Sequence, residues 1–145
     1  MQRDPFAGLG QAHRRGIRST LVFVDEALCE VQQWAEGREM HSELYEEHNS
    51  LSAKQSRLLI QEVAQMRAVI AELRDALDLE REHRSAAAAV HALACSLWPH
   101  LVELKGKHLN RYGDTPQEAV ERLSPSVDRL IERIKRIAEI VHERS

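Results

Sequence analysis

Two Glu-x-x-His pairs are the residues of this sequence whose types and spacing come nearest to chemistry: Glu80 with His83, and Glu139 with His142. In ferritin-like bundles two such pairs point inward and bind two metal ions, together with a glutamate from each of two further helices. Hard and borderline metals accept this mixture of carboxylate and imidazole ligands. A ferritin-like di-metal bundle is therefore one functional alternative for this chain.

The helical phase of both pairs argues against such a metal site. On the last helix Ile134 and Val141 define the apolar side, so Glu139 and His142 should face solvent. Glu80 lies on the extended apolar seam of its helix, but its histidine does not. A helical chain with eight histidines produces such pairs by chance, so we predict no bound metal.

No other pattern supplies the parts of an enzyme active site. The sequence has no glycine-rich phosphate loop, and no Ser or Cys stands in a recognisable nucleophile elbow. His41 and His48 lie among acidic residues, where we expect exposed side chains in preference to a surface metal site. The sequence therefore predicts a protein without catalytic residues or a cofactor.

The elements that would position any site are helices. Ala, Leu, Glu and Arg dominate the composition, aromatic residues make up only 4%, and charged residues make up 30%. The dominant residues lose little side-chain freedom in a helix. Because β-branched runs bounded by turns are missing, the sequence predicts an all-α fold.

Two long helices carry heptad seams, in which apolar residues alternate spacings of four and three. The first is predicted over residues 17–48, with a kink or phase change at Gly37. The second begins after a cap cluster at Asn49, Ser50 and Ser52. Its seam is the clearest in the chain, and we predict that it is an interaction seam. The seam residues are Leu59, Val63, Met66, Ile70, Leu73 and Leu77.

The C-terminal half is predicted to add two main helices and a connector. A turn near residues 83–85, capped by Ser85, precedes a helix over residues 86–111 that Pro99 should kink. Thr115-Pro116 begins a short helix that ends near Leu123, and Ser124-Pro125 precedes the final helix. A continuous helix over residues 79–86 is the alternative to the turn.

These elements predict one fold class: an antiparallel helical bundle with a long heptad-patterned hairpin, built from four main helices plus one short connector helix. Residues 1–16 contain Pro5 and three glycines without an apolar period, so we expect a flexible basic arm there. Residues 17–145 are then expected to form a single helical bundle domain.

Charge is unevenly distributed along this chain of net charge −3. Arginines gather in residues 1–18, and acidic residues gather in residues 25–48. We predict that part of the acidic segment is a patch that faces a protein partner. Basic clusters elsewhere are diluted by acidic residues, so the sequence does not favour nucleic-acid binding, which stays an alternative. The predicted acidic patch consists of Glu39, Glu43, Glu46 and Glu47.

The two cysteines and the hydropathy pattern predict the compartment. Cys29 and Cys95 lie in apolar helical patterns, where we expect free, buried thiols in a reducing environment. The longest apolar run near the N-terminus, residues 21–24, is too short for a secretory signal or a membrane span. We therefore expect a cytoplasmic protein without a membrane partner.

One part of the chain resembles a known family. The long heptad helix, the stretch from His108 to Gly113 and the following Glu118-Ala119-Val120 resemble GrpE-type nucleotide exchange factors. That resemblance implies a dimer of long paired helices that acts on Hsp70 chaperones. The family continues with a small β domain, whereas a helix is predicted to follow here.

The sequence as a whole favours a non-enzymatic scaffold, adaptor or interaction protein. The leucines of a heptad stripe are buried only when the stripe packs on another apolar stripe, so we expect a homodimer and a protein partner. The alternatives are a GrpE-like co-chaperone, a ferritin-like di-metal bundle and a nucleic-acid-associated helical protein.

Overall fold

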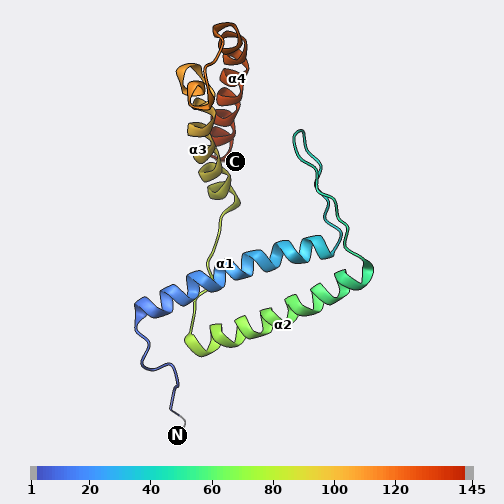
Figure 1. The fold of residues 1–145 in the computed structure, drawn as a ribbon. Coiled ribbons are helices and arrows are strands. Elements are labelled where there is room, and N and C mark those ends of the chain that lie inside the picture. Colours follow the sequence, from blue (N-terminus) through green and yellow to red (C-terminus); the bar gives the residue numbers. More distant parts are fainter. Residues whose placement is uncertain (1–2, 143–145) are drawn as a thin grey trace. The chain divides into compact units, whose positions relative to one another are not determined.

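The protein is all-α in the computed structural model, which describes residues 3–142 apart from the side chain of Lys107. Its four α-helices are α1 (Gln11–Ala35), α2 (Ala53–Leu77), α3 (Ala86–Val102) and α4 (Gln117–His142), and a 3-10 helix, η1, covers Gly106–Tyr112. The chain divides between Glu82 and His83 into two compact units, each built from one helix pair (Figure 1). The single domain expected over residues 17–145 stays a prediction.

The first unit is an antiparallel pair of α1 and α2, as the heptad seams predicted. Leu28 of α1 and Val63 and Leu77 of α2 are buried where the two helices meet. Ser52 caps α2: its hydroxyl accepts from the Gln55 N–H at 3.0 Å, and the Gln55 side chain accepts from the Ser52 N–H at 2.9 Å. This reciprocal cap satisfies backbone donors that a helix start leaves unpaired.

Helix α1 differs from its prediction at both ends. It begins at Gln11, so residues 11–16 of the expected flexible arm are helical. Arg14 explains this extension, because its Nη1 donates to the Leu77 carbonyl at 2.6 Å and fixes the first turns to the end of α2. The predicted continuation to residue 48 is wrong: the helix ends at Ala35, and Gly37 adopts φ +102°, which stops the helix instead of kinking it.

Residues 38–49, which we call the 38–49 loop, connect α1 to α2 without helical structure. Its two arms run side by side (Figure 1), and an isolated antiparallel bridge pairs His41 with Glu46. The tip of the loop is therefore residues 42–45. The Leu44 side chain at this tip is 98% exposed.

The second unit is an antiparallel pair of α3 and α4. The predicted turn before α3 is confirmed, because residues 79–85 are not helical and the Ser85 hydroxyl accepts from the Ala88 N–H at 3.3 Å. Ala94 of α3 and Val127 of α4 are buried. The helix predicted over residues 86–111 ends at Val102, and the short helix between the main ones is η1.

Helix α4 continues through Pro125, so the separate connector helix predicted to end near Leu123 is wrong. The reason lies in packing on either side of the proline. Val120 and Ser124 before it, and Val127 after it, all lie on the half-buried or buried side of the helix. Tertiary packing of this continuous stripe outweighs the backbone hydrogen bond that the proline removes.

Neither unit has a thick core. The buried hydrophobic residues of the described chain are few, and many large apolar side chains remain at the surface. Those buried are Leu28, Ala35, Val63, Leu77, Ala94 and Val127. Cys29 and Cys95 are free thiols but exposed, so the expectation of buried thiols is wrong. Over the helices that the structure describes, none is long and apolar enough to cross a membrane.

Candidate interaction surfaces

The residues of the predicted seam of α2 do not all face α1. Val63 and Leu77 are buried, and Leu59, Ile70 and Leu73 are half-buried, whereas the Met66 side chain is 45% exposed. The side chain next to Met66 explains the difference. Arg67 Nη1 donates to the Gln32 side chain at 2.9 Å, and its Nη2 lies 3.6 Å from the Cys29 sulfur, so position 67 faces α1. Position 66 is thereby turned to the flank of the pair.

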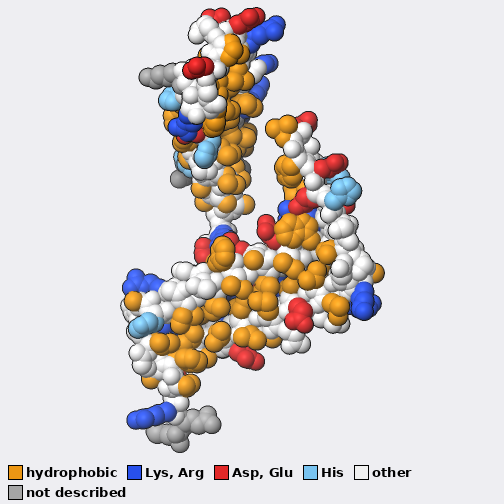
Figure 2. All heavy atoms as spheres, in the orientation of Figure 1, with side chains coloured by type: hydrophobic (Ala, Val, Ile, Leu, Met, Phe, Trp, Pro, Cys, Tyr) orange, Lys and Arg blue, Asp and Glu red, His pale blue; other side chains and the backbone are white. Residues whose placement is uncertain are grey.

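Apolar side chains cover one side of the first unit. At about 100° per residue, Phe23 and Ala27 of α1 lie on the same flank as Met66, Val69 and Leu73 of α2. Phe23 is 73% exposed and Val69 is 53% exposed. Figure 2 shows hydrophobic side chains over both helices on the side of this unit that it presents. We call these five residues the α1–α2 apolar face.

The second unit has a comparable surface. Leu93 and Leu97 of α3 lie on the same flank as Leu130 and Ile137 of α4, by the same helical geometry. Leu93 is 62% exposed, and the other three are exposed as well. We call these four residues the α3–α4 apolar face. Large contiguous apolar patches are uncommon on monomeric proteins and usually mark an interaction site.

The predicted acidic patch lies in the 38–49 loop, where Glu47 is its central anchor. Its carboxylate accepts from Trp34 Nε1 at 2.9 Å, from Arg38 Nε at 3.2 Å and from the Met40 N–H at 3.0 Å. Desolvation alone would raise the pKa of Glu47, but the hydrogen bonds from Trp34, Met40 and Arg38 outweigh it and the pKa is lowered. This glutamate therefore holds the loop to the end of α1.

Two further members of the patch also make contacts within the loop. Glu39 accepts from the Asn49 N–H at 3.0 Å, which is the main cause of its lowered pKa, and it lies 3.1 Å from His41 Nε2. Glu46 lies 2.9 Å from His41 Nδ1. Glu43 belongs to the tip. The role of the patch toward a partner stays a prediction, but three of its four carboxylates have a structural role here.

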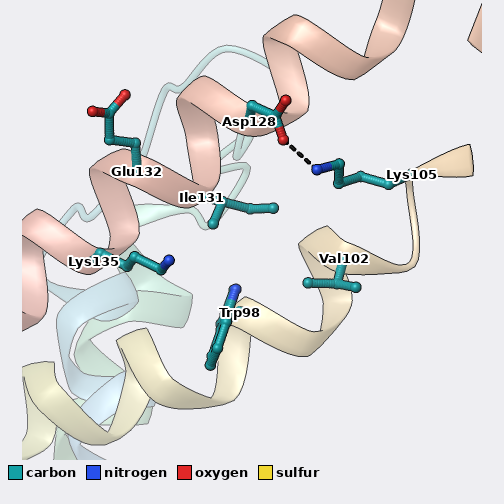
Figure 3. A pocket seen from close by; sticks show the side chains of 7 residues that line it. All are labelled: Trp98, Val102, Lys105, Asp128, Ile131, Glu132 and Lys135. Carbon is teal, nitrogen blue, oxygen red and sulfur yellow. Dashed lines mark ion pairs between the residues drawn. The ribbon is translucent and has the colours of Figure 1, made fainter. Parts of the chain in front are cut away.

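A polar groove of about 450 Å³ opens between α3 and α4 on the flank away from the α3–α4 apolar face (Figure 3). The Lys135 ammonium lies over the Trp98 ring, 5.3 Å from its centroid, and Lys105 forms an ion pair with Asp128. Glu132 also lines the groove. A cation that stacks on an indole is favourable by itself. Among the residues that line this groove, no Ser, Thr or Cys nucleophile lies next to a base.

The Glu-x-x-His pair on α4 directs its two side chains to different neighbours. Glu139 lies 3.5 Å from Arg136, and the His142 ring stacks near the His91 ring at a centroid distance of 5.0 Å. Cys95 lies 3.8 Å from His91 Nδ1. Within residues 3–142, no three or more His, Cys, Asp or Glu side chains are arranged to hold a metal ion.

The sequence alone did not distinguish the residues of the two apolar faces from the neighbouring residues that are buried inside each helix pair. A second stripe on α2, with Met66, Val69 and Leu73 at spacings of three and four, is visible in the sequence and indicates a second contact surface. Comparison of the chain with protein-family models, with curated proteins and with solved structures finds no match.

Proposed function

We propose that this chain is a non-enzymatic interaction protein that associates as a homodimer through the apolar faces of its helix pairs. One observation carries the proposal: each pair leaves several large apolar side chains exposed together on one flank, while the residues buried inside the pair are few. A scaffold or adaptor role follows from that surface, because protein contacts are what an exposed apolar flank provides.

The free energy of association favours an interface that buries many side chains over one that buries a single side chain. Full burial of one exposed Leu, Ile, Phe or Met side chain contributes about 1.5–3 kcal/mol. These side chains are already partly covered, so each contributes less than that. Association costs about 4–15 kcal/mol of lost freedom. Only a partner that covers both helices of a pair at once can offset this cost.

Solution mass tests the proposal. Light scattering coupled to size exclusion should give twice the chain mass at micromolar concentration. Replacement of Val69 by Lys, on the α1–α2 apolar face, should shift the mass toward the monomer because it places a charge in the contact. The matched control is Ala68→Lys, since Ala68 is exposed on the opposite flank of the same helix.

The expected result is a monomer for Val69→Lys and a dimer for Ala68→Lys, with equal helix content by circular dichroism. A wild-type chain that stays monomeric up to high concentration would refute homodimerisation. Equal masses for the two variants would show that the α1–α2 apolar face is not the contact.

A further inference from the structure

The two apolar faces are bordered by charges of opposite sign. On α4, helical geometry places Arg122, Arg129 and Arg133 on the edge next to Leu130 and Ile137. These three arginines are exposed, and Arg129 donates to the Ser126 hydroxyl at 3.2 Å. Glu118 lies on the outer side of α4, one turn before Arg122. The other four acidic residues of α4 lie on the flank toward the polar groove: Glu121, Asp128, Glu132 and Glu139. The α3–α4 apolar face therefore has a basic edge.

The α1–α2 apolar face has an acidic edge. Glu30 lies beside Phe23 on α1, and Glu62 lies beside Met66 on α2; both glutamates are exposed. Residues 19–35 of α1 contain no Lys or Arg. The arginines of α2 lie elsewhere, as the contact of Arg67 with Gln32 on the other side of the pair shows.

We propose that the α3–α4 apolar face of one copy packs on the α1–α2 apolar face of a second copy, with the Arg129 and Arg133 edge against the Glu30 and Glu62 edge. This inference rests on the proposed homodimer and specifies which surfaces meet in it. Each copy offers both faces, and the proposed dimer pairs them twice about a two-fold axis.

Charge decides between this pairing and the pairing of like faces. Two α1–α2 apolar faces in contact would bring glutamates together, and two α3–α4 apolar faces would bring arginines together. Like charges at an interface are costly, whereas complementary edges fix the register and add little affinity by themselves. Apolar burial then supplies the affinity, and the charged edges select the partner face.

A charge-swap experiment tests the pairing. One variant carries Arg129→Glu with Arg133→Glu, and the other carries Glu30→Arg with Glu62→Arg. Either variant alone should dimerise at least about tenfold more weakly than the wild type, because both of its contacts pair like charges. An equimolar mixture should form a heterodimer of near wild-type affinity, since both contacts are then complementary. Native mass spectrometry with one isotope-labelled copy measures this.

The matched control is Asp25→Arg with Asp75→Arg. It makes the same change of charge on α1 and α2 but on the flank away from the apolar face, so it should dimerise like the wild type. Circular dichroism checks that all variants keep their helix content. If a charge reversal unfolds the chain, neutral variants take its place: Arg129→Gln with Arg133→Gln, and Glu30→Gln with Glu62→Gln. Each of these double variants should weaken the dimer. The neutral control, Asp25→Asn with Asp75→Asn, should not.

The outcomes separate this inference from the proposed function. A wild-type dimer whose reversal variants keep full affinity, or whose mixture shows no preference for the heterodimer, overturns the face pairing and leaves homodimerisation standing. A wild-type monomer at every concentration overturns both. A preferred heterodimer, with both reversal variants weakened on their own and a control that behaves as the wild type, supports the pairing. Weakening of only one reversal variant means that like faces meet and overturns it.

Discussion

In the α1–α2 unit, polar contacts between distant parts of the sequence join the helices at both ends, whereas apolar contact dominates the α3–α4 unit. Arg14 and Arg18 donate to the carbonyls of Leu77 and Glu80 at one end of the first unit, at 2.6 Å and 2.9 Å. At the other end the 38–49 loop is hydrogen-bonded to the end of α1. The first unit therefore has a register fixed by directional bonds.

Over residues 83–142, as far as the structure describes them, the second unit has fewer such bonds, and α3 is the reason. Its 17 residues contain no Asp, Glu, Lys or Arg, so it is apolar or neutral on every side. A helix of that kind is normally buried all round. The comparison teaches that directional bonds fix the arrangement of the first unit, whereas α3 packs through apolar contact and still leaves Leu93 and Leu97 exposed.

The largest effect that sharpens this comparison is expected from Leu77→Ala. The Leu77 side chain is 2% exposed, so its truncation leaves a cavity and should lower the free energy of unfolding by about 2–5 kcal/mol. Leu58→Ala, on the exposed surface of the same helix, is the control and should change little. Urea denaturation measures both. Equal losses would mean that the α1–α2 contact is not the stabilising core of its unit.

The next effect concerns the bond that closes the 38–49 loop. Asn49 Nδ2 donates to the carbonyls of Trp34 at 2.7 Å and of Arg38 at 2.9 Å. Asn49→Ala removes both bonds, and also the one that its Oδ1 accepts from the Leu51 N–H at 3.2 Å. Each bond contributes about 0.5–1.5 kcal/mol, so the two that close the loop predict a loss of about 1–3 kcal/mol. Ser50→Ala is the control, because the exposed Ser50 side chain is next to it. Unchanged stability would show that the loop is held by its carboxylates alone.

Gly37→Ala should have a smaller effect of about 1–2 kcal/mol, because a left-handed backbone is unfavourable for a residue with a Cβ atom. Gly37 has φ +102°, and an added Cβ would meet no atom within 4 Å, so backbone strain is the whole cost. Gly16→Ala is the matched control: Gly16 lies inside α1 with equal space, and the alanine should stabilise the helix. Opposite signs for the two variants, measured by thermal unfolding, are the expected result.

The sequence predicted the parts of this fold that depend on periodicity. The heptad seams identified α1, α2 and the pairing of helices, and Ser52 and Ser85 marked two helix starts correctly. It predicted a kink or phase change at Gly37 but not the end of α1, because Met40 and Leu44 resume an apolar spacing after the glycine. The left-handed backbone of Gly37 ends the helix, and the bond from Trp34 to Glu47 holds the loop that follows. Periodicity carries no information on a contact between the helix and this loop.

The same limit applies to the candidate surfaces. The stripe with Leu59, Met66 and Leu73 and the stripe with Val63, Ile70 and Leu77 are neighbours on α2, so the pattern could not decide which of them meets α1. Arg67, a charged residue within the contact, decided it through its bond to Gln32. The helix predicted to break at Pro125 shows the converse, since packing there overrode a strong local signal.

The smallest effect is the pH dependence of the 38–49 loop, and it separates the loop from the helices that flank it. The pKa values of Glu39 and Glu47 are lowered from the usual 4.5 in the folded chain. A group with a lowered folded pKa contributes stability above its unfolded pKa, and that contribution is lost as the pH falls through the folded value. The loop should therefore loosen below about pH 4.5.

Trp34 reports this by fluorescence, because its indole N–H donates to Glu47 at 2.9 Å. The contribution is small because both carboxylates lie near solvent, where charge interactions are screened. Glu47→Gln should flatten the fluorescence transition, while Glu43→Gln at the tip should leave it in place. A transition of equal size in both variants would assign the pH response to the helix pair instead of the loop.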